Sequence, residues 1–233
     1  MAAPIELYTW PTPNGFKVSI LLEEIGMPYN VHAVNIGAGD QFEPDFLKIS
    51  PNNKMPAIVD PEGPDGKPFS LFESGAILMY LAEKSGRFWP QSHPAHWDTV
   101  KWLMWQMGGF GPMLGQAHHF RRYAPEKLDY AVDRYTKEAG RLYRVLDKRL
   151  GEAEYLAGDE YTIADMATFP WSRSIENQGW TADQFPNFKR WFDAINARPA
   201  VERGLQVLAE RRQAITSEEA RKNLFGDAQY AAR

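Results

Sequence analysis

The chain has 233 residues, 44% of them hydrophobic and 24% charged, and its net charge of −4 gives no acidic or basic excess that would favour nucleic acid or an anionic membrane. The absence of cysteine excludes disulfides, thiolate metal sites and a protein-borne thiol nucleophile. The N-terminus has no signal-peptide pattern and no apolar run approaches the roughly 18 residues of a membrane span, so we expect a cytoplasmic protein without membrane or nucleic-acid partners.

The first part of the chain has the pattern of a strand, a helix and a second strand. Residues 5–9 alternate in polarity, as a half-buried strand does. Apolar residues at helical spacing between Val18 and Ile25 predict a helix that ends at Gly26. Residues 31–36 form the second expected strand. Two strands joined through a helix of this length are expected to be parallel.

Two further strands and a helix follow. Residues 57–60 and 69–72 have strand character, and the segment between them, 61–68, is rich in proline and glycine. A connection this short predicts an antiparallel hairpin. Ser74 then opens a helix that should end near Gly86, so the order to this point is βαβ followed by ββα.

Strand signals disappear after the expected linker at 89–94. Helical patterns cover residues 95–120, 125–150, 162–178, 186–197 and 199–211. Thr162 and Asp165 form an expected capping box, and Pro170 should kink the helix that they start. We therefore expect an α/β domain at 1–87, an all-helical domain at 95–211 and a polar, loosely packed tail at 212–233.

This layout resembles that of the glutathione transferases, with a thioredoxin-like βαβ-ββα domain before an all-helical domain. The resemblance extends over about residues 5–210 and is closest to the nu class, bacterial enzymes with disulfide-bond reductase activity that are related to a fungal nitrogen regulator. The motifs that carry it, in chain order, are Pro11-Thr12-Pro13-Asn14-Gly15, Ser50-Pro51-Asn52-Asn53-Lys54, Leu71-Phe72-Glu73-Ser74-Gly75-Ala76-Ile77-Leu78, Gly111-Pro112-Met113-Leu114-Gly115-Gln116 and Tyr161-Thr162-Ile163-Ala164-Asp165.

Thr12 and Asn14 lie where the first strand turns into the first helix. Glutathione reacts as a thiolate, whereas a free thiol has a pKa of about 8.5. A helix N-terminus offers unpaired N–H groups and the positive end of the helix dipole, to which the two side chains can add hydrogen-bond donors. On spacing alone the segment also reads as a plain turn with an N-cap. The resemblance implies that Thr12 and Asn14 contact the glutathione sulfur and are the catalytic residues.

Pro56 is the cis-proline that the family pattern implies. A cis bond would present the backbone N–H and C=O of Met55 to the extended glutathione peptide, as in a short strand addition. Lys54 suits the glycyl carboxylate of glutathione. Gln41 is a weaker assignment to the same end, because its surroundings also read as a plain mobile loop.

Glu73 and Ser74 suit the other end of the ligand. Ser74 begins a helix, so its hydroxyl and N–H can hold the γ-glutamyl carboxylate, while Glu73 suits the ammonium group. Ser74 also reads as an ordinary N-cap, and both roles can hold together.

Five basic residues at spacings of three and four form a stripe on one expected helix: Arg134, Lys137, Arg141, Arg144 and Lys148. Such a stripe is usually a solvated face. The resemblance singles out Arg134, which would reach glutathione across the interface of a homodimer.

Other polar and aromatic residues have simpler interpretations. His118 and His119 are adjacent and do not share a helix face, so we expect no metal site. Tyr8 lies inside a strand, where packing is the expected role. Some of the following aromatic and methionine residues should line a pocket for the second substrate, and others should be core: Trp102, Trp105, Phe110, Met113 and Phe120.

The function that the resemblance implies is glutathione-dependent disulfide-bond reduction or transfer, with peroxidase activity on organic hydroperoxides as a further possibility. One or two glutathione molecules, or oxidised glutathione, would bind each site together with a small disulfide, hydroperoxide or electrophile. Two alternatives stay open from the sequence: a non-catalytic, glutathione-binding regulatory module, and a conventional transferase that conjugates aryl electrophiles.

Overall fold

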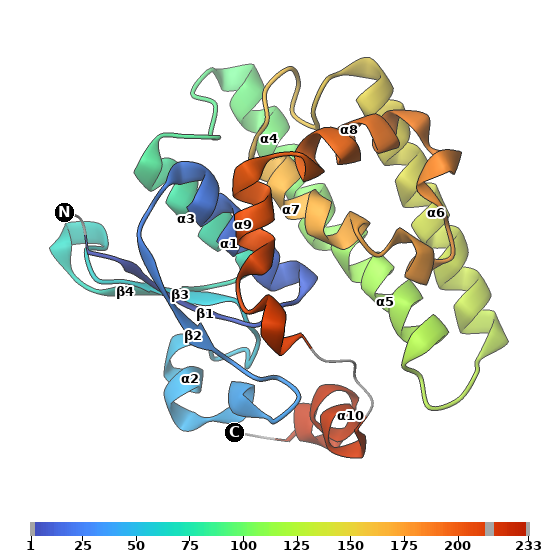
Figure 1. Cartoon of the computed structure of the whole chain (residues 1–233), viewed down its shortest axis with the longest axis horizontal. Helices are drawn as coiled ribbons and strands as arrows, with labels where there is room; N and C mark the ends of the chain where they lie inside the picture. Colours follow the sequence, from blue (N-terminus) through green and yellow to red (C-terminus); the bar gives the residue numbers. More distant parts are fainter. Residues whose placement is uncertain (1–2, 213–216, 232–233) are drawn as a thin grey trace. The chain divides into compact units, whose positions relative to one another are not determined.

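The computed structural model describes residues 3–212 and 217–231. These residues divide into two compact units (Figure 1). The described residues of Met1–Ile77 and Arg203–Arg233 make up the first unit, and Leu78–Glu202 make up the second.

The first unit contains a four-stranded sheet. Its elements are β1 (Ile5–Thr9), α1 (Pro13–Ile25), β2 (Tyr29–Ala33), α2 (Pro44–Ile49), β3 (Ala57–Asp60), β4 (Phe69–Phe72), the start of α3 (Ser74–Ser85), the end of α9 (Pro199–Gln206) and α10 (Glu218–Phe225). The strand order is β2-β1-β3-β4, with β1 and β2 parallel and both other pairs antiparallel. The predicted βαβ-ββα arrangement is therefore confirmed.

Strand β2 starts and ends earlier in the chain than the pattern predicts. Its register pairs Ile5 with Tyr29, so pairing begins as soon as the chain leaves Pro28. The Val34 N–H still donates to the Thr9 carbonyl at 2.9 Å, and after it the Asn35 N–H donates instead to the Asp40 carboxylate at 2.8 Å. The prediction therefore placed this strand, at 31–36, too far toward the C-terminus.

The two faces of β1 follow the alternation of its sequence. Ile5 and Leu7 are buried on one face. On the other face Tyr8 packs in a cluster that contains Phe46 of α2 and Met55. The difference between the two faces fixes the register of this strand, because a slip by one residue would move Ile5 and Leu7 to the half-buried face.

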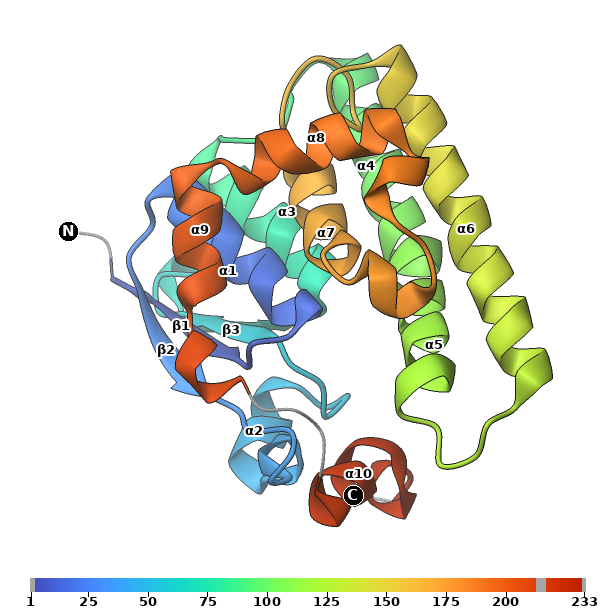
Figure 2. The same cartoon turned by 45° about the vertical axis from the view of Figure 1, so that its right-hand side comes forward.

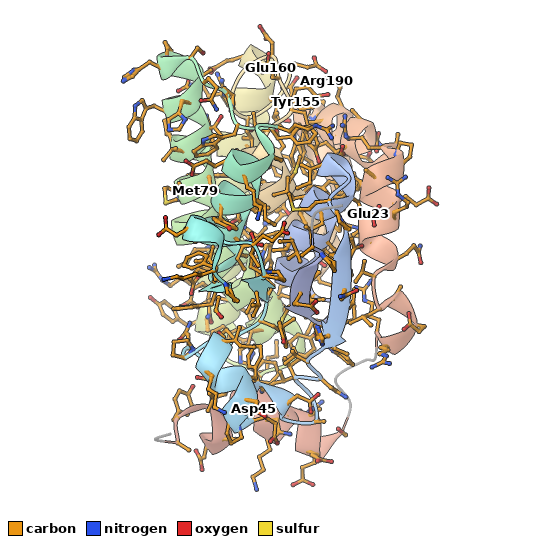
Figure 3. The ribbon with its side chains drawn as sticks, turned by 90° about the vertical axis from the view of Figure 1, so that its left-hand side faces the viewer. Glu23, Asp45, Met79, Tyr155, Glu160 and Arg190 are labelled. Carbon is orange, nitrogen blue, oxygen red and sulfur yellow. The ribbon has the colours of Figure 1, made fainter. Side chains whose placement is uncertain are left out.

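Helix α9 lies close against α1 (Figures 1 and 2). The Ser19 hydroxyl donates to the Gly204 carbonyl at 2.7 Å, and a Cβ added to Gly204 would lie 2.6 Å from Ile20 Cα. Arg203 also pairs with Glu23 at 2.6 Å (Glu23 is labelled in Figure 3). A glycine is thus needed at position 204 for the two helices to approach each other.

The C-terminal segment, which we predicted to be a polar and loosely packed tail, contains a short helix. Residues 218–225 form α10, and the Ser217 side chain caps it by accepting from the Ala220 N–H at 3.1 Å. No residue of α10 is buried, in agreement with its polar sequence. Polar contacts nevertheless join this segment to the loops of the first unit, as described below.

The second unit is helical. It contains most of α3, α4 (His93–Trp105), the π-helix Gln106–Phe110, α5 (Gly111–Arg122), α6 (Asp129–Glu152), α7 (Ile163–Ser172), α8 (Pro186–Asn196) and the start of α9. The helix predicted at 95–120 is interrupted by the π-helix around Gly108. The helix predicted at 162–178 ends at Ser172, two residues beyond Pro170, and a 3-10 turn follows at 175–178.

The capping box at the start of α7 is confirmed. The Thr162 hydroxyl accepts from the Ala164 N–H at 3.3 Å, and the Asp165 carboxylate accepts from the Thr162 N–H at 3.0 Å. Asp165 is fully buried and also accepts from Trp191 Nε1 at 2.8 Å. Burial raises the pKa of Asp165 in spite of these hydrogen bonds.

Among the described helices, none combines the length and the apolar character of a bilayer span.

Candidate functional site

Three of the predicted site segments meet at one edge of the sheet. Strand β1 is antiparallel to β3, and β3 is antiparallel to β4, so the end of β1, the start of β3 and the end of β4 lie together. The register places Ala57 beside both Tyr8 and Phe72. Thr12 and Asn14 follow β1, Lys54 to Pro56 precede β3, and Glu73 and Ser74 follow β4.

Thr12 is the N-cap of α1. Its backbone is extended, with φ −123°, and its hydroxyl oxygen accepts from the Gly15 N–H at 3.2 Å. The same hydroxyl donates to Met55 Sδ at 3.5 Å. Thr12 and Asn14 are both half-buried at the positive end of the α1 dipole. The Thr12 hydroxyl therefore already donates a hydrogen bond to a sulfur atom. It can donate in the same way to the sulfur of a ligand bound at the N-terminus of α1.

Gly15 makes this arrangement possible. A Cβ at that position would lie 2.3 Å from the Trp10 carbonyl oxygen and 2.9 Å from Met55 Cε. Both distances are too short for a side chain. The glycine lets the first turn of α1 come close to the segment that precedes β3.

The segment before β3 contains the cis peptide bond Met55–Pro56, as the family pattern implies. The Ser50 hydroxyl donates to the Lys54 carbonyl at 2.7 Å and holds the segment in place. The Lys54 side chain is exposed, and partial desolvation of its ammonium lowers its pKa. This ammonium donates to the side-chain oxygen of Gln229 in the C-terminal segment.

Glu73 and Ser74 lie at the junction of β4 and α3. Glu73 adopts a left-handed backbone conformation, with φ 71°, and its exposed carboxylate accepts from Asn52 Nδ2 at 3.5 Å. Ser74 is buried, with 5% of its surface exposed. Its hydroxyl oxygen accepts a hydrogen bond of 3.4 Å from the Lys17 ammonium.

Gln41 lies in a different environment from the mobile loop that its sequence suggests. It is buried, with 2% of its surface exposed, in the 3-10 turn Asp40–Phe42. Its amide nitrogen donates to the carbonyl oxygens of Ile36 at 3.3 Å and Asn223 at 3.4 Å. Its amide oxygen has no hydrogen-bond partner among the described residues.

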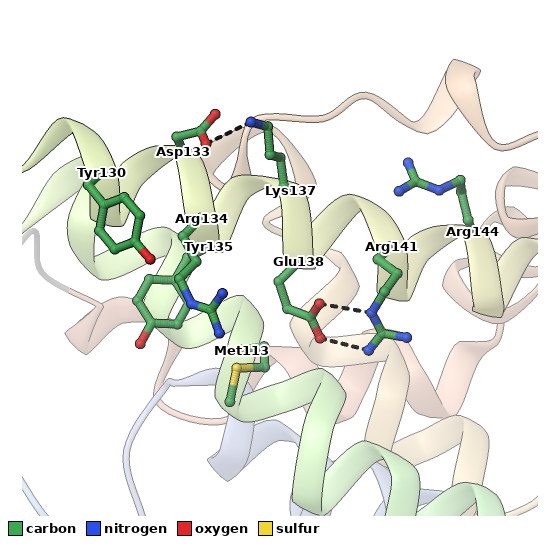
Figure 4. A pocket seen from close by; sticks show the side chains of 9 residues that line it. All are labelled: Met113, Tyr130, Asp133, Arg134, Tyr135, Lys137, Glu138, Arg141 and Arg144. Atoms are coloured by element: carbon green, nitrogen blue, oxygen red, sulfur yellow. Dashed lines mark hydrogen bonds and ion pairs between the residues drawn. The ribbon is translucent and has the colours of Figure 1, made fainter.

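Arg134 lies on α6 in the second unit and is exposed. It lines a groove of about 560 Å³ with Met113, Tyr130, Asp133, Tyr135, Lys137, Glu138, Arg141 and Arg144 (Figure 4). Within that groove Arg141 forms a two-bond ion pair with Glu138, at 2.7 and 2.8 Å, whereas Lys137 pairs with Asp133 at 2.7 Å. The basic stripe is thus partly neutralised by acidic residues of the same helix.

The aromatic residues considered for a second-substrate pocket divide into two sets. Phe110 is fully buried against Tyr143, with ring centroids 5.4 Å apart, and belongs to the core of the second unit. Trp102 and Trp105 are half-buried and contact each other edge to face, with ring centroids 5.3 Å apart.

The His118 ring stacks on the Tyr123 ring, with centroids 5.0 Å apart. Burial, followed by the charges of Arg122 and His119, lowers the pKa of His118. Among residues 3–212 and 217–231, no three His, Asp or Glu side chains gather as metal ligands would.

Sequence reasoning missed three polar residues at the site: Lys17, Asn223 and Gln229. Lys17 is the one charged residue in the apolar stretch from Phe16 to Leu22, which is a local signal that could have drawn attention to it. Its side chain is 1% exposed, and burial lowers its pKa to about 7, against the charge of Glu73, which raises it. Asn223 and Gln229 lie in a polar segment with no comparable signal.

Comparison with known proteins identifies the family. Residues 3–83 match the N-terminal domain of glutathione S-transferases, and residues 106–199 match the C-terminal domain. The disulfide-bond oxidoreductase YfcG of Escherichia coli is 50% identical over 202 residues, which cover 86% of this chain and 94% of that protein. The chain belongs to the glutathione S-transferase family. As in that family, a thioredoxin-like domain precedes a helical one.

Two solved structures of related glutathione transferases contain the ligand. The Burkholderia graminis transferase holds two glutathione molecules per subunit, and it is similar to this family member with a TM-score of 0.84 and 48% identity over 88% of each chain. The Pseudomonas putida transferase holds one glutathione disulfide per subunit, with a TM-score of 0.83 and 46% identity over 88% of this chain and 91% of that one. Helix α10 lies beyond both matched family domains.

Proposed function

We propose that this family member is a glutathione-dependent disulfide-bond reductase that works through a bound glutathione thiolate. The observation that carries the proposal is the meeting of Thr12 and Asn14, Lys54 to Pro56, and Glu73 and Ser74 at one sheet edge. The similarity to YfcG, named a disulfide-bond oxidoreductase, supports the same activity.

The thiolate is stabilised at the N-terminus of α1. The helix dipole, the Thr12 hydroxyl and the Asn14 side chain act on the sulfur. Each hydrogen bond to an anion contributes about 1.5–3 kcal/mol, so two of them can lower the thiol pKa by one unit or more. A lowering of about two units brings the thiol pKa to about 6.5 and makes the thiolate the main form of bound glutathione near neutral pH.

The rest of the tripeptide extends along the sheet edge. Ser74 holds the γ-glutamyl carboxylate and Glu73 holds the ammonium group of the ligand. The backbone of Met55, beside Pro56, pairs with the cysteinyl residue, and Lys54 and Gln41 hold the glycyl end. Opposite charges at the two ends of the site fix the direction in which glutathione binds.

The reduction proceeds by thiol–disulfide exchange and needs no cysteine of the protein. The thiolate of one glutathione attacks a sulfur of the substrate disulfide, forms a mixed disulfide and releases one substrate thiolate, which takes up a proton. A second glutathione thiolate then attacks the mixed disulfide, releases the other substrate thiol and leaves glutathione disulfide. The two ligand states held by the Burkholderia graminis and Pseudomonas putida relatives correspond to the start and the end of this sequence.

We further propose that the protein is a homodimer, in which Arg134 of one protomer reaches the glutathione of its partner. The groove on α6 supports this role, because its four basic side chains outnumber its two acidic ones on an exposed surface. A cytoplasmic location fits the proposal, since glutathione is kept reduced there.

Steady-state assays with glutathione test the proposal. We expect turnover of 2-hydroxyethyl disulfide, with a slower rate on an organic hydroperoxide such as cumene hydroperoxide. A rate on an aryl halide that exceeds the disulfide rate would favour a conjugating transferase instead. Saturable glutathione binding without turnover of any of the three substrates would identify a regulatory binding module.

A further inference from the structure

The described C-terminal segment, residues 217–231, lies beside the loop that follows β2 and the predicted glycyl end of the site (Figures 1 and 2). It belongs to the same compact unit as the sheet. Asn223 Nδ2 donates to the Gly37 carbonyl at 2.8 Å, and the Asn223 carbonyl accepts from Gln41 Nε2 at 3.4 Å. Gln229 accepts from the Lys54 ammonium. Both side chains assigned to the glycyl end therefore contact this segment.

The two contacts are coupled through Gln229. Its amide oxygen accepts from Lys54, while its amide nitrogen donates to the Asn223 carbonyl. The Gln229 side chain thus links Lys54 to the Asn223 carbonyl, which also accepts from Gln41. A ligand group that takes the place of Gln229 on Lys54 removes a hydrogen bond that joins the segment to the site.

The hydrogen bonds that join the segment to Gly37, Gln41 and Lys54 lie on a part of the chain with little buried surface. No residue of α10 or of the 3-10 turn Asp227–Gln229 is buried. Water can replace hydrogen bonds of this kind, and segments with little buried apolar surface open at a small cost in free energy. The contact is therefore suited to being made and broken while the sheet stays folded.

The closed arrangement leaves two polar groups poorly satisfied. The Gln41 amide oxygen is buried without a partner among the described residues, which is unfavourable for a polar atom removed from water. The Lys54 ammonium is partly desolvated but faces a neutral amide, and its pKa is lowered. A carboxylate forms stronger, charge-assisted hydrogen bonds with an ammonium than an amide does.

From these contacts we propose that residues 217–231 form a lid over the glycyl end of the glutathione site, in which Gln229 occupies the position on Lys54 that the glycyl carboxylate takes. Gln229 is then a specificity-determining residue. Only a ligand with a carboxylate at this end displaces it efficiently, and opening of the lid also makes Gln41 accessible. The inference rests on the proposed function of the same site.

Titration calorimetry with full-length variants tests the lid. Gln229→Ala removes the competing acceptor, so the Kd for glutathione should fall about three- to tenfold, as expected for the loss of one competing hydrogen bond of ordinary net strength. Gln229→Glu places a carboxylate on Lys54 and should raise the Kd. Tyr230→Ala is the matched control, because Tyr230 is the neighbouring residue and is 83% exposed. Its Kd should equal that of the unmodified protein.

The dipeptide γ-glutamylcysteine separates the glycyl end from the rest of the site. Because it lacks glycine, its affinity should be the same for the unmodified protein and for Gln229→Ala. Hydrogen exchange provides a second measurement: saturation with glutathione should speed the exchange of the α10 amides.

Three results would overturn the lid. Weaker glutathione binding by Gln229→Ala would mean that Gln229 helps to hold the ligand, and an unchanged Kd would mean that the contact has no role. Slower exchange of α10 in the complex would mean that the segment closes on glutathione. Failure of the proposed function has a different signature, which is no uptake of either peptide by the unmodified protein or by any variant, and the lid would fall with it.

Discussion

The Lys17 ammonium on α1 lies 3.4 Å from the Ser74 hydroxyl at the start of α3. Lys17 is buried and contacts Ser74, the residue assigned to the γ-glutamyl carboxylate. The negative charge of Glu73 favours the protonated form of Lys17. Lys17 thus links α1, for which we propose the contact with the sulfur, to α3, for which we propose the contact with the γ-glutamyl end of glutathione.

Lys17 should give the protein a measurable pH dependence of stability. Burial lowers its pKa from 10.5 to about 7 in the folded state. Between these two values the unfolded chain binds more protons than the folded one, so the free energy of unfolding should rise with pH by up to about 1.4 kcal/mol per unit. Urea unfolding from about pH 7 to about pH 9 measures this slope. Lys17→Met should lack it, and the exposed surface variant Lys48→Met should keep it. Equal slopes in all three proteins would contradict the assignment.

Thr12 should matter through its hydroxyl. Thr12→Ala removes the N-cap acceptor, which costs about 1 kcal/mol of stability, and removes a donor to the thiolate. We expect kcat for disulfide reduction to fall about 10- to 100-fold, as for one hydrogen bond to an anion. The ultraviolet absorbance of the bound thiolate should show a raised thiol pKa. Thr12→Ser keeps the hydroxyl and should restore most of both values; a serine variant as impaired as the alanine variant would argue against this role.

Tyr8 should not act on the sulfur. Its ring stacks on His32 at a centroid distance of 4.5 Å and packs against Phe46. Burial and the charge of Glu6 raise the pKa of its phenol, so the group stays neutral at physiological pH. We expect Tyr8→Phe to retain the turnover rate and the glutathione affinity, measured in the same assay. Loss of most of the activity with unchanged affinity would show that the tyrosine contacts the sulfur.

Arg134 and Arg141 provide a matched pair on α6. Arg141 is neutralised by Glu138 in a two-bond ion pair, whereas Arg134 is exposed in the same groove. If Arg134 binds the partner's glutathione, Arg134→Ala should raise the Kd for glutathione about tenfold, as for one charge-assisted hydrogen bond. Arg141→Ala should change it little. Sedimentation should show a dimer for both variants. Equal affinities of the two variants would remove Arg134 from the site.

Local patterns in the sequence were sufficient to predict the fold, whereas the candidate site was predicted from the resemblance of short motifs to the glutathione transferases. The alternation of 5–9, the glycine-rich hairpin at 61–68 and the capping box at Thr162 each depend on a few consecutive residues, and the structure confirms all three. The segments around Thr12, Met55 and Ser74 were recognisable for the same reason. Each is a short motif at the end of a strand, and strand order alone brings such ends together.

The tertiary structure decided the contacts between residues that are far apart in the chain. Lys17 meets Ser74 across 57 positions, Gln41 meets Asn223 across 182, and Lys54 meets Gln229 across 175. Periodicity shows which face of an element is apolar, but it does not show which polar group on another element lies opposite. A lysine becomes buried, and a polar tail becomes a lid, only after packing has fixed their neighbours, because the free energy of each contact depends on how far both partners are removed from water.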